Sequence, residues 1–204
     1  MSDVRCQMSE KSIADGSLQI NMGWQNSETG VQLSGQELYD RQKQIVAARS
    51  AAFDVRVAAI GIQAHANVGA ILRVADAAGC SQVLFVDRQM NAHLNRKAAN
   101  ISRQSENLLP WVSLTTDQFV EMAGTLPMLI ALELTTASHN LFTCELPPQC
   151  TFVIGSERDG VPANVLSLCQ FAVHIPMYGL NGSMNVTHAM GVALFEHRRR
   201  FPPV

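Results

Sequence analysis

The chain has 204 residues, of which 47% are hydrophobic and 16% charged. This is the composition of a folded globular protein, and it excludes a chain that is disordered throughout. The length suits one domain with an appendage, large enough to be stable without a disulfide or a structural metal. The net charge of −2 at pH 7 argues mildly against a nucleic-acid partner, because proteins that bind through bulk positive charge are basic.

We expect no membrane segment and no secretion leader. No apolar run reaches the roughly 18 residues of a transmembrane helix, and the acidic N-terminus lacks an apolar core. The cysteines are odd in number and contain no C-x-x-C pair, which favours reduced thiols in a cytoplasmic protein over disulfides or zinc. They are Cys6, Cys80, Cys144, Cys150 and Cys169.

The N-terminal segment differs in character from the rest of the chain. Residues 1–33 are polar and interrupted by glycines, which predicts a loosely packed arm. Ser34 and Glu37 then have the spacing of a capping box, so a helix should run from there to the end of the segment. We therefore expect residues 1–52 to form a polar arm and a helix, and residues 53–204 to form the main domain. The role of the first 50 residues stays open.

From Val55 onward, short β-rich runs alternate with helical patterns. Continuous apolar runs predict strands that are buried on both faces, and strict alternation of strands and helices predicts an α/β fold with a mainly parallel sheet flanked by helices. The expected strands are 55–62, 82–86, 111–114, 127–133, 151–155 and 171–175, and the expected helices are 68–78, 92–105, 116–123, 162–169 and 183–199.

Ligands of open α/β sheets bind at the carboxyl ends of the strands, and the first polar segment there contains Asn67 and Arg73. Asn67 has the position of an N-cap for the helix 68–78, and Gly79 that of its C-cap. Arg73 lies on a different helix face from the apolar stripe. A non-functional alternative is that Arg73 forms an exposed ion pair with Asp76, which would contribute little to the stability of the protein.

Two further segments follow later strands. Residues 155–161 form a glycine-flanked acidic turn that lacks the pattern of a phosphate loop. The third segment is a loop after Ile175, and we expect Ser183 to cap the helix that follows it, with Asn185 in the first turn. For the basic end of that helix, 197–200, we favour a solvated helix terminus that complements the helix dipole.

Together the three segments resemble the sequence motifs of the SpoU (TrmH-like) branch of the SPOUT RNA methyltransferases. The resemblance covers about residues 53–200. Any one motif is moderately specific, whereas all three in order are strong evidence. The matching residues are Asn67, Gly69 and Arg73 in the first motif, Gly155, Glu157, Gly160 and Val161 in the second, and Ile175, Pro176, Met177, Ser183, Met184, Asn185 and Val186 in the third.

The resemblance implies a C-terminal trefoil knot, an exception to the usual rule against knots, and a homodimer. It also implies S-adenosylmethionine as cofactor, held by backbone groups and apolar side chains. From the cysteine spacing and the lack of a long apolar run, we expect no metal and no membrane partner. The expected cofactor-binding residues are Leu132, Leu134, Gly155, Ile175, Met177, Ser183 and Met184.

The implied reaction is methyl transfer to a ribose 2′-hydroxyl of RNA. The family assigns activation of that hydroxyl to the arginine, here Arg73. A protonated guanidinium has no acceptor, so stabilisation of the developing alkoxide or of the adjacent phosphate is an open alternative to a general base. The other candidate catalytic residues orient the loops and the substrate; they are Asn67, Glu157, Ser183 and Asn185.

RNA contacts are expected from a local basic face, so the charge of −2 does not exclude RNA. The candidates are Arg73, Arg96, Lys97, Arg103 and Arg158. Trp111 is expected in the core, and His188 in the core or at the dimer interface, without a catalytic role. The small size of the chain favours tRNA over rRNA. A catalytically silent RNA-binding protein and a knotted methyltransferase acting on a base are the competing hypotheses.

Overall fold

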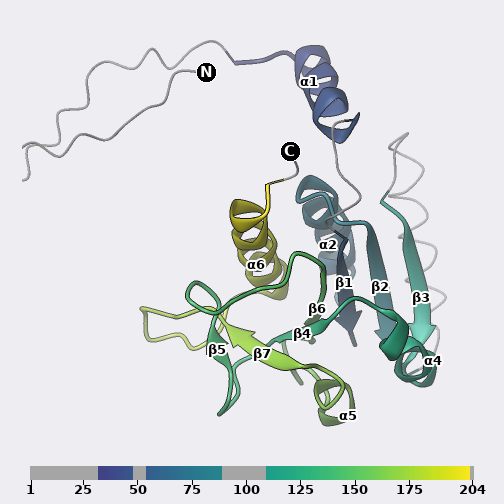
Figure 1. Cartoon of the computed structure of the whole chain (residues 1–204), viewed down its shortest axis with the longest axis vertical. Helices are drawn as coiled ribbons and strands as arrows, with labels where there is room; N and C mark the ends of the chain where they lie inside the picture. The colour runs from purple at the N-terminus through teal and green to yellow at the C-terminus, as the bar shows by residue number, and fades with distance from the viewer. Residues whose placement is uncertain (1–31, 48–53, 89–108, 203–204) are drawn as a thin grey trace, which may run out of the picture. The chain divides into compact units, whose positions relative to one another are not determined.

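The structure is a computed structural model, and it describes residues 32–47, 54–88 and 109–202. Its centre is a seven-stranded sheet of order β3-β2-β1-β6-β4-β7-β5, in which every pair of neighbouring strands is parallel (Figure 1). This confirms the predicted α/β class. The strands are β1 Val55–Ile60, β2 Gln82–Asp87, β3 Trp111–Thr115, β4 Leu129–Leu132, β5 His139–Asn140, β6 Cys150–Ile154 and β7 Phe171–His174. The helices are α1 Gly35–Ala47, α2 His65–Ala77, α4 Thr116–Met122, the 3-10 turn η1 Ala123–Thr125, α5 Ala163–Leu166 and α6 Val186–Arg200.

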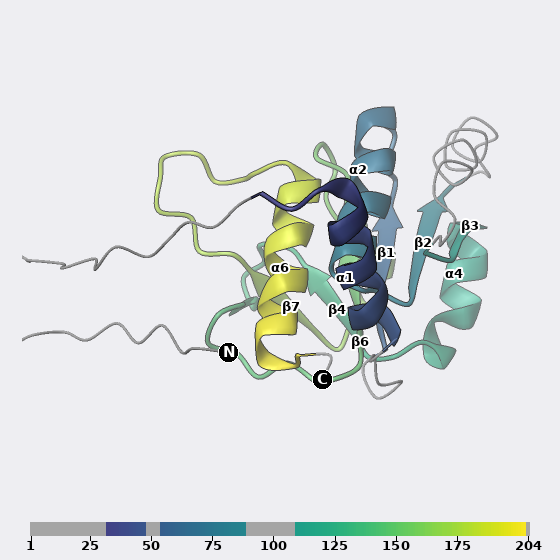
Figure 2. The same cartoon turned by 90° about the horizontal axis from the view of Figure 1, so that it is seen from above.

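The sheet is covered on both faces, as the apolar strand sequences predict. Alternate residues of β1 point in opposite directions: Val57 and Ala59 pack with α2 and α6, whereas Ala58 and Ile60 pack with α4 and α5. Figure 2 shows α2 and α6 next to each other, away from α4. Trp111, predicted in the core, is partly buried: it packs against the first of these cores and makes an edge contact with Phe85.

The order of the strands reverses between β1 and β6. After β1 the chain passes through α2 to β2 and then β3 on one side, whereas after β6 it passes through α5 to β7 on the other. Connections that leave adjacent strands in opposite directions open a crevice at the carboxyl ends of those strands. The crevice therefore lies where the loops after β1 and β6 begin.

Helix α1 falls on the boundary between two compact units, residues 1–42 and 43–204, and is described by itself. Its predicted capping box is present: the Glu37 amide donates to Ser34 Oγ at 3.3 Å, and the Ser34 amide donates to Glu37 Oε2 at 2.8 Å. Its apolar side chains Leu38 and Ile45 are 48% and 42% exposed. The described helix ends at Ala47, and the rest of the predicted helix lies outside the described residues.

All six strand predictions are correct to within two residues at each end. The two-residue strand β5 was not predicted, since it is too short to leave a pattern. Helix α2 starts three residues earlier than expected, and α6 starts three residues later. The helix predicted over residues 92–105 lies outside the described part of the chain. None of the described helices is long and apolar enough to cross a membrane.

The cysteines of the described segments, Cys80, Cys144, Cys150 and Cys169, are free thiols, as expected. Burial raises the pKa of the Cys150 thiol to about 12 and that of the Cys169 thiol to about 11. Because the thiolate is the reactive form, both groups act as small apolar side chains near neutral pH.

The prediction of a solvated basic terminus for α6 is wrong. His197 is fully buried, with Nε2 2.9 Å from the Pro147 carbonyl oxygen. Arg200 donates from Nη2 to the Leu141 carbonyl at 2.6 Å, and Arg198 donates to carbonyls at the end of α2. Carbonyl oxygens of neighbouring loops, and not water alone, therefore satisfy these cations. The sequence shows the charges but not the loops that fold against them.

The buried ring of His197 predicts a pH dependence of stability. Burial lowers the pKa of His197, with smaller contributions in the same direction from Arg198 and Arg200, despite an opposing hydrogen bond with the Pro147 carbonyl. The unfolded chain therefore binds a proton that the folded chain excludes. The contribution of His197 to the free energy of unfolding should be at its maximum above about pH 6.5. The free energy of unfolding should then fall as the pH drops below that value.

Denaturant unfolding of the wild type and of His197→Gln, at about pH 7 and at about pH 5.5, measures this effect. The loss on acidification should shrink in His197→Gln. It should persist in His188→Gln, which removes an exposed histidine of the same helix. Hydrogen bonds from Arg199 and Arg200 lower the pKa of Glu196 to about 2. The effect of Glu196 on the free energy of unfolding therefore appears at a lower pH than that of His197. An unchanged loss in His197→Gln would contradict the assignment.

Candidate active site

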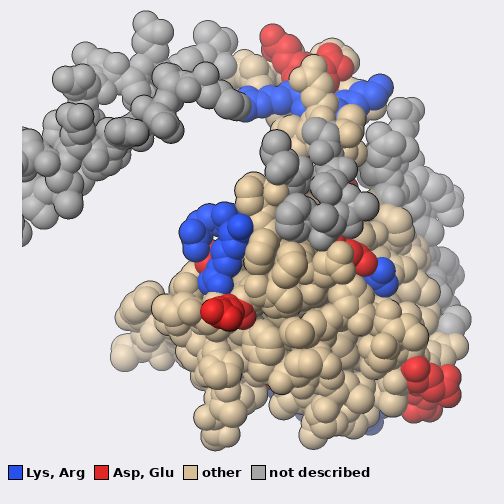
Figure 3. Space-filling view, in the orientation of Figure 1, with Lys and Arg blue, Asp and Glu red and all other residues tan. Residues whose placement is uncertain are grey.

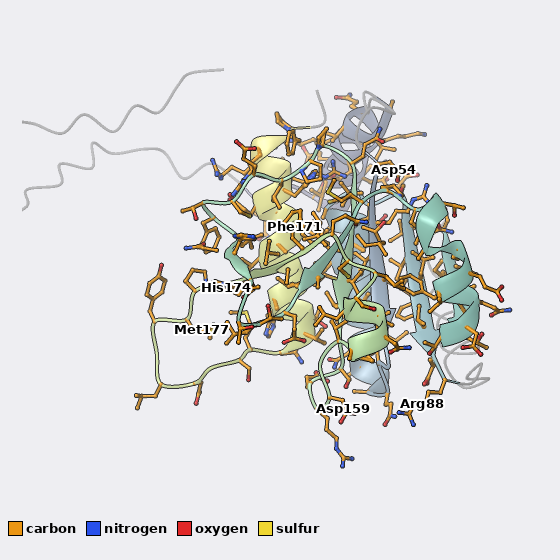
Figure 4. The ribbon with its side chains drawn as sticks, turned by 60° about the horizontal axis from the view of Figure 1, so that its bottom comes forward. Asp54, Arg88, Asp159, Phe171, His174 and Met177 are labelled. Carbon is orange, nitrogen blue, oxygen red and sulfur yellow. The ribbon has the colours of Figure 1, made fainter. Side chains whose placement is uncertain are left out.

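The three motif segments meet at the carboxyl end of the sheet. The first begins α2 after β1, the second follows β6, and the third follows β7 and leads into α6. Figure 4 shows Asp159 of the second segment at the end of the molecule opposite Asp54, which precedes β1. The segments are adjacent because β1 and β6 are neighbours at the switch point of the sheet.

One side chain from each motif joins a hydrogen-bonded group that we call the motif cluster: Asn67, Glu157 and Asn185. Glu157 Oε1 accepts from Asn67 Nδ2 at 2.5 Å and from Asn185 Nδ2 at 3.1 Å. Asn185 Nδ2 also lies 3.3 Å from Asn67 Oδ1. Asn67 is only 8% exposed. Hydrogen bonds to a carboxylate are stronger than those between neutral groups, so Glu157 holds the starts of α2 and α6 together.

The structure corrects the expected caps of both helices. Ala64 is the N-cap of α2, and its methyl side chain cannot make a capping hydrogen bond. Asn67 lies within the first turn of the helix, and its amide donates to Glu157. Asn185, and not Ser183, caps α6: its Oδ1 accepts from the Thr187 amide at 2.9 Å. The side-chain oxygen of Asn185 therefore caps the helix, and its side-chain nitrogen donates to the motif cluster. Ser183 is exposed and lies outside this network.

The second motif forms a turn that only glycine permits at Gly155. A Cβ atom there would lie 2.0 Å from the Gly160 carbonyl carbon. Gly160 has φ of +64°, a left-handed conformation that favours glycine. The Gly160 amide donates to the Ser156 carbonyl at 2.9 Å, which closes the turn. The glycines thus fix a tight loop that presents Glu157 to the crevice.

Sequence reasoning missed Glu133 as a residue that shapes the site. Its Oε2 accepts from the Val161 amide at 3.0 Å, and its Oε1 from the Leu134 amide at 3.1 Å. The carboxylate thereby ties the end of β4 to the end of the second-motif turn. A carboxylate directly after a buried apolar strand was the available signal, but nothing in the sequence identified its distant partner.

Arg73 lies on α2, exposed and without a hydrogen bond or ion pair to any residue that the structure describes. The alternative of an Arg73–Asp76 ion pair is therefore not observed. A guanidinium with unused donors is available to bind an oxyanion.

The side chains expected to hold the cofactor line the carboxyl ends of β4 and β7 and the start of α6. Leu132 and Ile175 pack against the core, Leu134 is 67% exposed and Met177 is 38% exposed. Figure 4 shows Met177 on the loop that leaves the sheet after His174. Within the described residues, the backbone of 176–184 makes no hydrogen bond to another backbone group. Exposed apolar side chains beside unused backbone donors and acceptors fit an adenine ring.

The expected RNA contacts divide into two groups. The Arg158 side chain is 92% exposed and lies 3.9 Å from Asp159, and Arg73 is also exposed. The expected basic helix with Arg96, Lys97 and Arg103 lies outside the described residues. On the face in Figure 3, a basic group with acidic atoms beside it lies over the end of α6, and a separate acidic group lies near α4. His188 is exposed, which rules out its core position and leaves the interface alternative.

Comparisons with known proteins identify the class. The family model for the SpoU rRNA methylase family matches residues 54–195, and the chain belongs to this family. It is 32% identical over 147 residues, 69% of the chain and 56% of the relative, to the 23S rRNA (guanosine-2′-O-)-methyltransferase RlmB of Neisseria meningitidis serogroup B. The RlmB of Pseudomonas aeruginosa is 31% identical over 160 residues, 76% of the chain and 63% of the relative.

Solved structures agree with the fold. An RNA 2′-O ribose methyltransferase structure matches with a TM-score of 0.60 and 25% identity, over 74% of this chain and 58% of that one. The TrmH/SpoU tRNA-modifying enzyme of A. aeolicus has the same fold, with a TM-score of 0.63 and 23% identity, over 80% of this chain and 84% of that one. The chain spans somewhat more than half the length of the curated relatives it matches.

Proposed function

We propose that the protein transfers a methyl group from S-adenosylmethionine to a ribose 2′-hydroxyl of RNA. The observation that supports this most is the motif cluster, in which Asn67, Glu157 and Asn185 from the three motifs share hydrogen bonds. Arg73 lies on the same helix as Asn67 and pairs with no residue that the structure describes. A silent RNA-binding protein would have no need to keep this arrangement of amides, carboxylate and guanidinium.

Arg73 is the proposed catalytic residue. Its guanidinium would stabilise the negative charge that develops on the ribose oxygen, or bind the phosphate next to it. Asn67, Glu157 and Asn185 are positioning residues that hold α2 and α6 in register, and Ser183, exposed on the third-motif loop, is proposed to contact the substrate or the cofactor. Because methyl transfer needs an in-line approach, positioning supplies much of the catalysis.

The cofactor would be held by Leu132, Leu134, Gly155, Ile175, Met177, Ser183 and Met184. It supplies an electrophilic methyl group. The apolar side chains of this set would bury the adenine, and the open backbone of the loop after β7 would provide its hydrogen bonds. We propose residues 53–204 as the methyltransferase domain, with a trefoil knot in its C-terminal part, acting as a cytoplasmic homodimer.

The RNA is proposed to be ribosomal. The preference for tRNA drawn from chain size is not confirmed, because the curated relatives named above methylate guanosine in 23S rRNA. Arg158 and Arg73 would contact RNA phosphates, together with Arg96, Lys97 and Arg103. Binding that depends on such a small basic set should be modest and sensitive to salt.

Incubation of the protein with total RNA and S-adenosylmethionine labelled in the methyl group tests the activity. Nucleosides released from the RNA should include a labelled 2′-O-methylnucleoside, found in the rRNA fraction. Label on a base would instead support a base methyltransferase, and absence of label would support a silent binding protein. Either result overturns the proposal.

A further inference from the structure

Helices α2 and α6 lie next to each other on one face of the sheet (Figures 1 and 2). Hydrogen bonds join them at both ends. At their N-terminal ends the link is the motif cluster, with Asn185 bonded to Asn67. At their C-terminal ends, Arg198 of α6 donates from Nε to the Ala78 carbonyl at 2.6 Å and from Nη2 to the Gly79 carbonyl at 2.7 Å. The two helices therefore run parallel and are connected at two points.

The geometry at the end of α2 explains why an arginine suits this position. The Gly79 amide donates to the Asp76 carbonyl at 2.8 Å, and the Cys80 amide donates to the Ala75 carbonyl at 2.9 Å. With φ of +71° at Gly79, this is a Schellman motif. It leaves the later carbonyls of Ala78 and Gly79 pointing out of the helix. A planar guanidinium can bond both at once, and its charge is favourable at a helix C-terminus.

The end of α6 that contains Arg198 is bonded to a part of the chain that is separate from α2. In the same turn of α6, Arg200 bonds the Leu141 carbonyl at 2.6 Å and also the Cys144 carbonyl, and His197 contacts the Pro147 carbonyl at 2.9 Å. The end of α6 is therefore fixed to the segment between β5 and β6. Because Arg198 bonds the last carbonyls of α2, the fixed end of α6 also restrains α2 from sliding along its own helix axis.

We propose that Arg198 is a positioning residue for methyl transfer, acting through α2 on Arg73 and Asn67. Arg73 lies less than two helical turns from Ala78, so a displacement of the end of α2 is carried to its guanidinium. Apolar side chains of both helices pack in the same core, and a Cβ at Gly191 would lie 3.5 Å from Val74 Cγ1. Apolar packing is not directional, so we assign the setting of the register to the polar links at the two ends. This inference rests on the proposed function, since it needs Arg73 to act in the reaction.

The test compares Arg198→Ala, Arg198→Lys and Val165→Ala. Val165 is buried in the core on the α5 side, so its truncation lowers stability without touching α2. All assays use full-length protein well below its unfolding temperature. In Arg198→Ala, kcat should fall about tenfold or more while the dissociation constant for S-adenosylmethionine stays within about twofold, because a displacement of about 1 Å is costly for positioned groups. Arg198→Lys should recover part of kcat through one of the two bonds, and Val165→Ala should keep the wild-type kcat.

A double mutant separates positioning from general destabilisation. If Arg198 acts through Arg73, then Arg198→Ala should lower single-turnover methyl transfer far less in an Arg73→Ala background than in the wild type. Equal losses in both backgrounds, or a wild-type kcat in Arg198→Ala, would overturn the inference. A wild-type protein that forms no 2′-O-methylnucleoside would instead remove the proposed function on which it rests.

Discussion

Replacement of Arg73 by alanine should reduce methyl transfer to RNA by about 100- to 1000-fold, the loss seen when one donor to a developing oxyanion is removed. The protein should fold normally, because Arg73 is exposed and bonds no other described residue. Its affinity for S-adenosylmethionine should also be unchanged. Single-turnover kinetics with labelled cofactor, together with calorimetric titration of the cofactor, measure the two quantities separately.

Two variants accompany this measurement. Asp76→Ala changes an exposed residue one turn further along α2, and it should keep wild-type turnover. Arg73→Lys keeps the charge but loses the planar pair of donors, so a small recovery above Arg73→Ala is expected. Wild-type turnover in Arg73→Ala would exclude Arg73 as the catalytic residue.

Truncation of Glu157 to alanine should lower kcat by about a hundredfold, comparable to the effect of a 1 Å displacement of a reacting group. The carboxylate accepts hydrogen bonds from both Asn67 and Asn185. Without it, the partly buried Asn67 amide loses its partner and the starts of α2 and α6 are free to separate. Glu157→Gln keeps an acceptor oxygen in the same place, so its loss should be clearly smaller.

Asp159→Ala is the matched control for Glu157. Asp159 lies on the same turn, and its carboxylate makes only a 3.9 Å contact with the exposed Arg158. Steady-state assays of these variants, with circular dichroism to verify folding, give the comparison. If Glu157→Ala and Asp159→Ala have the same kcat, the motif cluster does not position the reacting groups.

The strands were predictable because burial on both faces produces runs such as MLIAL, and the β/α alternation predicted that they are parallel. Their order in the sheet was not predicted, because alternation alone does not say which strands are neighbours. Cap positions were less predictable. Asn67 and Ser183 both precede apolar helical stripes, yet Asn67 bonds Glu157, and Asn185 takes the capping role. A polar side chain near a helix start has several possible partners, and only the tertiary structure selects among them.

The candidate site was predictable as three segments, since each motif lies at a strand end. The hydrogen bonds that connect these segments were not predictable. The links from Glu133 to Val161 and from Arg198 to Ala78 join positions far apart in the chain, and local pattern gives no information on such pairs. The basic end of α6 shows the same limit, because charge alone did not distinguish a solvated terminus from one bonded to neighbouring loops.

The net charge of −2 gains a structural interpretation. Several of the basic side chains are engaged within the protein: Arg56 with Asp54, Arg198 with α2, and Arg200 with Glu196 and a loop. The cations free to meet RNA are therefore fewer than the composition suggests. Recognition would depend more on the shape of the crevice than on overall charge.

The most direct test is mass spectrometry of ribosomal and transfer RNA from cells with and without the gene. The account predicts that one 2′-O-methylnucleotide, in rRNA, disappears on deletion. It should return with the wild-type protein but not with Arg73→Ala. An unchanged set of 2′-O-methylnucleotides in the deletion strain, or full restoration by Arg73→Ala, would contradict it.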